Sequence, residues 1–262
     1  MSTQPRLSRA LAWTALILAV CQAAAVFIPL VQFGGEPNDS GVDLYISPAG
    51  YAFGIWAVIY VLSIVVGVMF VRNQATGTRS PRRLAIDLAL TFAAAALWLI
   101  VSAADVGWIP SILLTVMAVA LLDAARIAAG PADDTAPHSL NTTVRITVGI
   151  YAAWATAAVF VNWASDLGRT VADPDSLGWQ LVILIAAAVV GIVATYLVGG
   201  ALPAYPIVLV WAFVAIAVNA WSTSTVVVVC CAIAIVAVIG AYVLARGRVV
   251  RRAHPLSPAT GS

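Results

Sequence analysis

The sequence predicts an all-α membrane protein, a polytopic bundle of helices that cross the bilayer. The first observation behind this class is composition: 63% of the 262 residues are hydrophobic, only 9% are charged, and the mean hydropathy is +1.02. Soluble domains do not carry so much apolar surface. The second observation is that the apolar residues form long uninterrupted runs, whereas a membrane β-barrel would alternate apolar and polar residues.

Eight of these runs approach the roughly 20 residues that a helix needs to cross a bilayer. The seventh run is the shortest, and it is counted as a span with the others. The eight predicted helices cover about residues 9–30, 49–71, 84–104, 109–129, 146–165, 178–198, 204–221 and 225–245.

Charged residues divide unequally between the two sides that eight spans would create. Every basic residue is an arginine, and all but Arg169 fall on one side. The positive-inside rule therefore predicts a cell-membrane protein with both termini in the cytoplasm. The arginines of the tail, residues 247–262, are expected to set topology and contact anionic lipids rather than bind nucleic acid. Seven acids then face outward: Glu36, Asp39, Asp43, Asp105, Asp166, Asp173 and Asp175.

The second predicted helix carries an aromatic stripe close to its outer end. Phe53, Trp56 and Tyr60 stand at positions i, i+3 and i+7, so they share one helical face. Such a stripe either packs against neighbouring helices or lines a pocket for a flat ligand. Gly50 and Gly54 form a GxxxG pair, which is typical of closely packed membrane helices.

The fifth predicted helix carries a second stripe that ends near the same surface. Tyr151, Trp154, Ala158 and Asn162 stand at i, i+3, i+7 and i+11. An amide inside a membrane needs hydrogen-bond partners, so Asn162 either bonds to a neighbouring helix or contacts a ligand. Trp98, in the outer third of the alanine-rich third helix, lies at a similar depth.

Three charges interrupt the apolar windows near their cytoplasmic ends. Arg83 and Asp87 are spaced i, i+4, and Asp123 and Arg126 are spaced i, i+3. Each couple is expected to pair locally along its own helix, which lowers the cost of the buried charge. A proton or ion path through Asp87 and Asp123 is the alternative interpretation.

No motif in the chain indicates catalysis or metal binding. His138 and His254 lie in polar segments, which disfavours a histidine-ligated haem inside the membrane. The cysteines show no CxxC spacing, and there is no acid pair, catalytic triad pattern or phosphate-binding glycine loop. We therefore expect a protein that is not an enzyme.

The segment Pro48-Ala49-Gly50-Tyr51-Ala52-Phe53-Gly54-Ile55-Trp56, followed by Tyr60, resembles the second-helix signature of the TspO/MBR family. These tryptophan-rich sensory proteins are related to the mitochondrial translocator protein, or peripheral benzodiazepine receptor. The stripe from Tyr151 to Asn162 resembles the family's fifth-helix pattern, Trp98 a third-helix tryptophan and Pro29 a first-helix proline. The likeness covers residues 8–166.

The resemblance implies a five-helix core over 8–166, followed here by a three-helix extension over 167–246. It also implies a pocket that opens toward the loop after the first helix, with residues 32–46 as its cover. Family members are linked to porphyrins, sterols and drug-like aromatic ligands, and often form dimers. A tetrapyrrole ligand and a homodimer are therefore expectations for this chain.

Together these features predict a membrane receptor or sensor that binds a flat hydrophobic, tetrapyrrole- or sterol-like ligand. The predicted pocket residues are Phe53, Trp56, Tyr60, Trp98, Tyr151, Trp154 and Asn162, with aromatic stacking supplying affinity and Asn162 orienting the ligand. The alternative is a secondary transporter of a small hydrophobic or amphipathic molecule, with the extension as a moving partner of the core. A purely structural role for the aromatic stripes is a third hypothesis.

Overall fold

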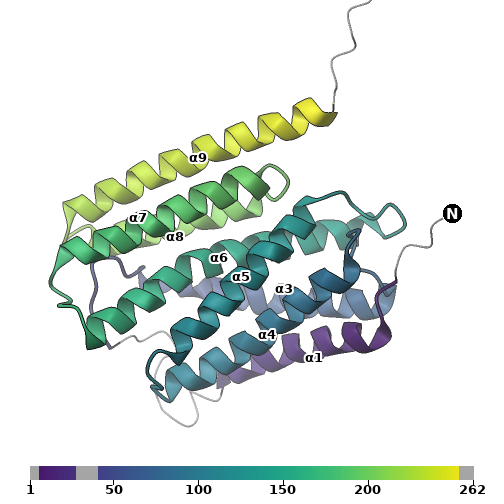
Figure 1. The fold of residues 1–262 in the computed structure, drawn as a ribbon, viewed down its shortest axis with the longest axis horizontal. Helices are drawn as coiled ribbons and strands as arrows, with labels where there is room; N and C mark the ends of the chain where they lie inside the picture. Colours follow the sequence, from purple (N-terminus) through teal and green to yellow (C-terminus); the bar gives the residue numbers. More distant parts are fainter. Residues whose placement is uncertain (1–5, 28–40, 254–262) are drawn as a thin grey trace, which may run out of the picture.

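The computed structural model describes residues 6–27 and 41–253 and folds them into an antiparallel bundle of eight α-helices (Figure 1). Within these ranges the extended structure is limited to a single bridge between Thr78 and Ala132. The α-helices are α1 (Arg9–Ala25), α3 (Ile55–Asn73), α4 (Pro81–Ala103), α5 (Ile109–Ala129), α6 (His138–Thr170), α7 (Leu177–Ala194), α8 (Ala204–Ala220) and α9 (Thr225–Ala253). Two short segments join them: the 3-10 helix η1 (Gly50–Gly54) and the π-helix η2 (Thr195–Gly199).

Six helical segments are long and apolar enough to cross a membrane, while α1 and α8 are apolar but only 17 residues long. This arrangement confirms the predicted polytopic helical bundle. Successive helices run in opposite directions, so α1 begins and α9 ends at the same end of the bundle (Figure 1). We call this the terminal end, and the opposite end, which carries connections 104–108, 171–176 and 221–224, the pocket end.

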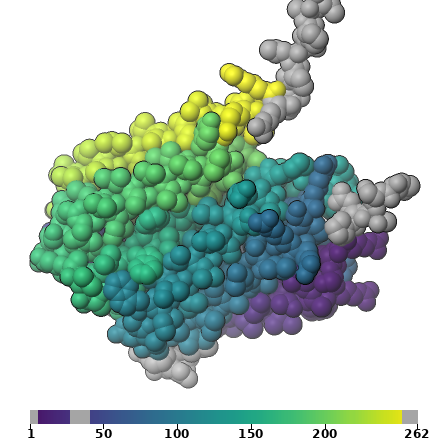
Figure 2. All heavy atoms as spheres, viewed as in Figure 1, coloured from purple at the N-terminus to yellow at the C-terminus, as the bar shows by residue number. Residues whose placement is uncertain are grey.

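Helix α6 is the central helix of the molecule and the longest. It contacts α3 and α5 on one side and α7 and α8 on the other, and Figure 2 shows the green-to-yellow helices packed along one flank of the earlier ones. The predicted helix over 146–165 was too short at its beginning, because residues 138–145 are too polar to look like a span. The structure extends α6 there by burying Leu140 and by a 2.7 Å bond from Asn141 Nδ2 to the Gly77 carbonyl.

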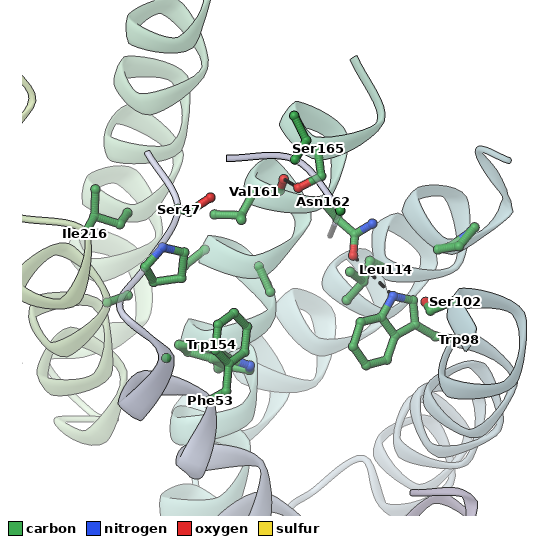
Figure 3. Close-up of a pocket in the computed structure, with 18 of the residues that line it drawn as sticks. Ser47, Phe53, Trp98, Ser102, Leu114, Trp154, Val161, Asn162, Ser165 and Ile216 are labelled. Carbon is green, nitrogen blue, oxygen red and sulfur yellow. Dashed lines mark hydrogen bonds between the residues drawn. The ribbon is translucent and has the colours of Figure 1, made fainter. Parts of the chain in front are cut away.

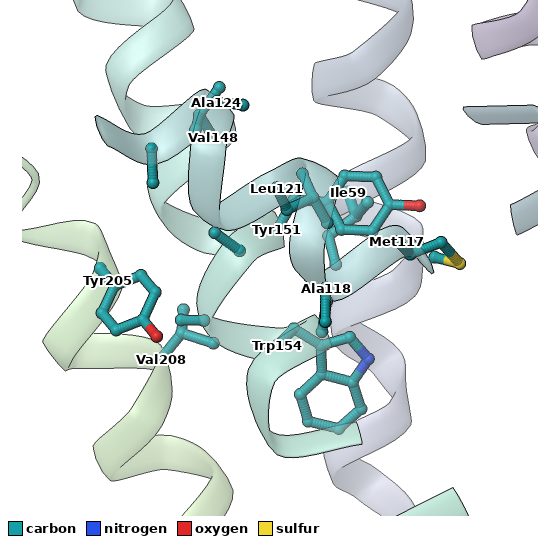
Figure 4. Packing of buried hydrophobic residues seen from close by; sticks show 14 of the residues in the cluster. Ile59, Met117, Ala118, Leu121, Ala124, Val148, Tyr151, Trp154, Tyr205 and Val208 are labelled. Atoms are coloured by element: carbon teal, nitrogen blue, oxygen red, sulfur yellow. The ribbon is translucent and has the colours of Figure 1, made fainter. Parts of the chain in front are cut away.

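Figure 4 shows how aromatic side chains fill the core around α6. Tyr151 and Trp154 face α3, while Tyr205 approaches α6 from α8. The Tyr205 hydroxyl lies 2.9 Å from the hydroxyl of Thr156, and all four side chains are buried. The last three helices are thus joined to the first five by a polar contact as well as by apolar packing.

The GxxxG pair does not bring helices together, contrary to the prediction. Gly50 and Gly54 bound η1, and a Cβ atom at either would meet no atom within 4 Å. Close approach occurs instead at Gly67 of α3, where a Cβ would lie 2.8 Å from the Cα of Leu16 in α1. The segment before η1 is held by the Ala49 amide, which donates to the Ala215 carbonyl of α8 at 3.0 Å.

The predicted local charge pairs are also corrected. Arg83 of α4 reaches across to Asp123 of α5, with Nε–Oδ2 and Nη2–Oδ1 distances of 2.6 and 2.8 Å. This two-point guanidinium–carboxylate pair can form between helices because α4 and α5 pack side by side. Asp87 and Arg126 make no ion pair with any residue that the structure describes.

Candidate functional site

A cavity of about 530 Å³ lies at the pocket end of the bundle, between η1 and helices α3, α4, α5, α6 and α8 (Figure 3). Its wall combines aromatic and aliphatic side chains with a few polar ones near the bundle end. The segment 41–49 before η1, which is made of bends and turns, forms another part of the wall. The lining residues are Gly41, Val42, Asp43, Ser47, Pro48, Gly50, Phe53, Trp56, Trp98, Ser102, Asp105, Pro110, Leu114, Trp154, Ala157, Ala158, Val161, Asn162, Ser165, Arg169, Ala212, Ile216 and Asn219.

One wall of the cavity is an aromatic cluster built from η1 and the helices α3, α4 and α6. Trp56 of α3 stacks on Trp98 of α4, with ring centroids 5.5 Å apart and planes inclined by 25°. Trp154 of α6 meets Trp56 edge-on at 6.3 Å and Phe53 edge-on at 5.8 Å. These offset-stacked and edge-to-face geometries are the favourable ones for aromatic pairs, so the four rings support one another.

Five of the seven predicted pocket residues line this cavity: Phe53, Trp56, Trp98, Trp154 and Asn162. Tyr60 and Tyr151 do not. Tyr60 stacks behind Trp56 at 5.7 Å, and Tyr151, which is fully buried, meets Trp56 edge-on and donates its hydroxyl to Gln22 Oε1 of α1 at 3.1 Å. The helical periodicity placed these tyrosines on the correct face but one turn too deep to reach the cavity.

Asn162 connects the aromatic cluster to a polar network. Its Oδ1 accepts a hydrogen bond from Trp98 Nε1 at 3.2 Å (dashed in Figure 3), and its Nδ2 donates to Ser111 Oγ at 3.2 Å. The amide therefore bonds to two neighbouring helices while it also lines the cavity. The two interpretations that the sequence left open for Asn162 are compatible in this geometry.

The network continues to the mouth of the cavity through buried charge. Ser111 Oγ donates to Asp166 Oδ2, and Arg169 Nη2 donates to Asp166 Oδ1 at 2.6 Å. The second guanidinium nitrogen, Nη1, donates to Asp105 Oδ1 at 2.7 Å. Asp166 is 2% exposed and Asp105 78% exposed, so Arg169 bridges a buried carboxylate and a solvated one.

Two buried polar atoms on the cavity wall have no hydrogen-bond partner among the described residues. They are Nε1 of Trp154 and Oγ of Ser102. A buried donor without a partner is costly, and a hydrogen-bond acceptor inside the cavity would remove that cost. The cavity is thus walled by aromatic side chains, and two polar groups without a partner lie buried within that wall.

Sequence reasoning missed three contributions to this site. Ser111 lies in the first turn of α5, and a single serine at such a position does not indicate a binding site. Asp166 was counted among the acids expected to face outward. Its i, i+3 spacing to Arg169 was the available clue. The third contribution is the α8 wall, which includes Ile216 and Asn219.

The predicted cover over 32–46 lies mostly outside the described residues. Of its described part, residues 41–46, the first three residues line the cavity.

Comparison with known proteins links the chain to one family. A family model described as "TSPO-like protein" matches residues 9–244. The matched region therefore includes α7, α8 and most of α9 as well as nearly all of the 8–166 segment whose motifs carried the resemblance. No curated protein and no solved structure matches the chain.

Proposed function

The chain belongs to the family of TSPO-like proteins, and from this premise we propose that it is a non-enzymatic membrane receptor for a flat hydrophobic ligand. The observation that supports the proposal is the wall of Phe53, Trp56, Trp98 and Trp154 around a cavity of about 530 Å³. Cavities of roughly 300–1,000 Å³ with aromatic walls and few polar groups are typical small-molecule sites.

The geometry suggests how such a ligand would be held. A planar ring system placed against the stacked Trp56 and Trp98 pair would bury its faces on aromatic surface, which supplies most of the affinity. Asn162 would orient the ligand from the side through its amide. A tetrapyrrole- or sterol-like ligand and a homodimeric state, both implied by the family resemblance, stay predictions.

The experiment is a titration of detergent-purified protein with protoporphyrin dimethyl ester, whose two carboxyl groups are esterified and therefore uncharged, read out by tryptophan fluorescence quenching. Trp56→Phe and Trp154→Phe should each weaken saturable binding by about tenfold, since a well-packed aromatic contact contributes about 1.5 kcal/mol. Trp221→Phe is the matched control, because it removes one indole that is exposed and does not line the cavity. Linear quenching in all four proteins would refute protoporphyrin binding at this site.

A secondary transporter is the second candidate. It is favoured by the fact that helices of the first five and helix α8 of the last three both line the cavity. One wall comes from α3, α4, α5 and α6, and the opposite wall comes from α8, so a movement of α8 would open the site. Uptake or efflux of a bound dye in proteoliposomes that is abolished by Asp87→Asn or Asp123→Asn would support this candidate. Transport that is indifferent to both variants would count against a carboxylate-coupled mechanism.

The orientation in the membrane belongs to the same proposal. The arginine excess at the terminal end would place that end in the cytoplasm by the positive-inside rule, and the cavity would then face the exterior. Labelling intact cells with a membrane-impermeant maleimide tests this, using Asp173→Cys at the pocket end and Asp134→Cys at the terminal end. Labelling of Asp134→Cys alone would reverse the orientation.

A further inference from the structure

The mouth of the cavity carries an excess of negative charge. Among the residues that the structure describes, the ionisable side chains lining the cavity are Asp43, Asp105 and Arg169, and Asp166 is paired with Arg169. Three carboxylates therefore accompany one guanidinium. Asp43 is exposed and makes no ion pair with any residue that the structure describes.

The guanidinium of Arg169 at the mouth already forms ion pairs with two carboxylates. Arg169 donates through Nη1 to Asp105 at 2.7 Å and through Nη2 to Asp166 at 2.6 Å. An anionic ligand would have to displace Asp105 from this pairing, and a displaced Asp105 carboxylate would remain beside it as a repelling charge. The mouth thus offers a ligand carboxylate no free cationic partner.

The charge of the whole pocket end has the same sign. Asp173 and Asp175 lie in the connection after α6 at this end, whereas Arg169 is the only arginine there among residues 6–27 and 41–253. The remaining arginines lie toward the terminal end of the molecule. A one-signed field focused at a cleft attracts ligands of opposite charge and repels those of like charge.

The cavity wall is also suited to a positive charge. Trp56, Trp98 and Trp154 present indole rings, which attract cations more strongly than phenyl or phenol rings do. We infer that the cavity selects flat aromatic ligands that carry a protonated or quaternary nitrogen, over neutral or carboxylate-bearing ones of the same shape. This inference rests on the proposed function and adds the charge of the ligand, with Asp43 and Asp105 as the residues that determine the preference.

The test compares three ligands that share one flat tricyclic ring and differ in charge. They are 9-aminoacridine, which is cationic at pH 7.5, acridine, which is neutral, and acridine-9-carboxylate, which is anionic. Binding is measured by ligand fluorescence and by calorimetry in an uncharged maltoside detergent, so that cations do not partition into anionic lipid. The proteins are the unchanged chain, the double variant Asp43→Asn/Asp105→Asn, and Asp133→Asn/Asp134→Asn as a matched control that removes the same charge from the connection between α5 and α6, at the opposite end of the bundle.

We expect the unchanged chain to bind the cation more tightly than acridine and the carboxylate most weakly. Each carboxylate about 6 Å from the ligand charge contributes about a tenfold preference at an effective dielectric constant of about 40. The double variant should lose the preference for the cation and bind acridine as before, while the control keeps it. The preference should also shrink between 0.05 and 0.5 M salt, because exposed charges are screened.

The outcomes separate this inference from the proposal beneath it. Saturable binding of acridine or its carboxylate that equals or exceeds binding of 9-aminoacridine overturns the charge preference and leaves the receptor proposal standing. A preference that survives in the double variant overturns the assignment to Asp43 and Asp105. Absence of saturable binding for all three ligands, in protein whose circular dichroism is unchanged, contradicts both.

Discussion

Replacement of Arg169 by alanine tests whether the buried charge network stabilises the pocket end of the fold. Asp166 is 2% exposed, and its carboxylate is held by Arg169 on one oxygen and by Ser111 on the other. Arg169→Ala leaves that carboxylate buried without a counter-ion. Breaking a buried pair in this way costs about 3–5 kcal/mol. Arg169 is 31% exposed, so water replaces part of the lost interaction, and we expect a loss of about 3 kcal/mol.

The assay is equilibrium unfolding by sodium dodecyl sulfate in mixed micelles, followed by circular dichroism. Asp105→Ala is the internal comparison, because it removes the other partner of the same guanidinium. Asp105 is 78% exposed, so its loss should cost less than about 1 kcal/mol. The structure therefore predicts very different effects for two ion pairs of nearly equal length, 2.7 and 2.6 Å.

A second substitution separates loss of the pair from a general packing defect. Asp166→Asn in the Arg169→Ala background replaces the buried charge with a neutral amide that can still bond to Ser111, so most of the lost stability should return. The reasoning is refuted if Arg169→Ala and Asp105→Ala are equally destabilising. It is also refuted if Asp166→Asn adds to the damage instead of relieving it.

Two further predictions concern the backbone and the terminal end. Gly77 has a φ of +75°, and a Cβ there would lie 2.8 Å from the Asn141 Cα, so Gly77→Ala should destabilise by about 2 kcal/mol. Gly240→Ala, where a Cβ meets no atom within 4 Å, should be neutral or stabilising by up to about 1 kcal/mol, and thermal unfolding in detergent compares the two. For Arg83 and Asp123, a double-mutant cycle should give a coupling below about 1 kcal/mol because Arg83 is 66% exposed, and a coupling above about 2 kcal/mol would contradict the exposed geometry.

The class and layout of the bundle were predictable from the sequence because they depend on properties that a single helix already has. Apolar length indicates which segments can span a membrane, and an even number of antiparallel helices places the start of α1 and the end of α9 at the same end of the bundle, as Figure 1 shows. Helical periodicity likewise determines which side chains share a face. It placed Phe53 and Trp56 together, and Trp154 and Asn162 together, and all four line the cavity.

Helix starts were less predictable, because polar turns give no hydropathy signal. The first eight residues of α6 are helical since Leu140 is buried and Asn141 bonds to the Gly77 carbonyl of another connection. These contacts form only after α6 has packed against the preceding helices. A window of hydropathy contains no information about them.

Only the tertiary structure decided which faces meet and how far each one reaches into the site. It paired Arg83 with Asp123 across two helices, joined Ser111 to Asp166, and left Tyr151 one turn below the cavity while α8 supplied a wall. The physical reason is that periodicity relates residues along one helix, whereas rotation about each axis and the choice of neighbours follow from packing all the helices at once. The sequence by itself thus determined a membrane bundle with two aromatic faces, and packing made those faces into one cavity with an acidic mouth.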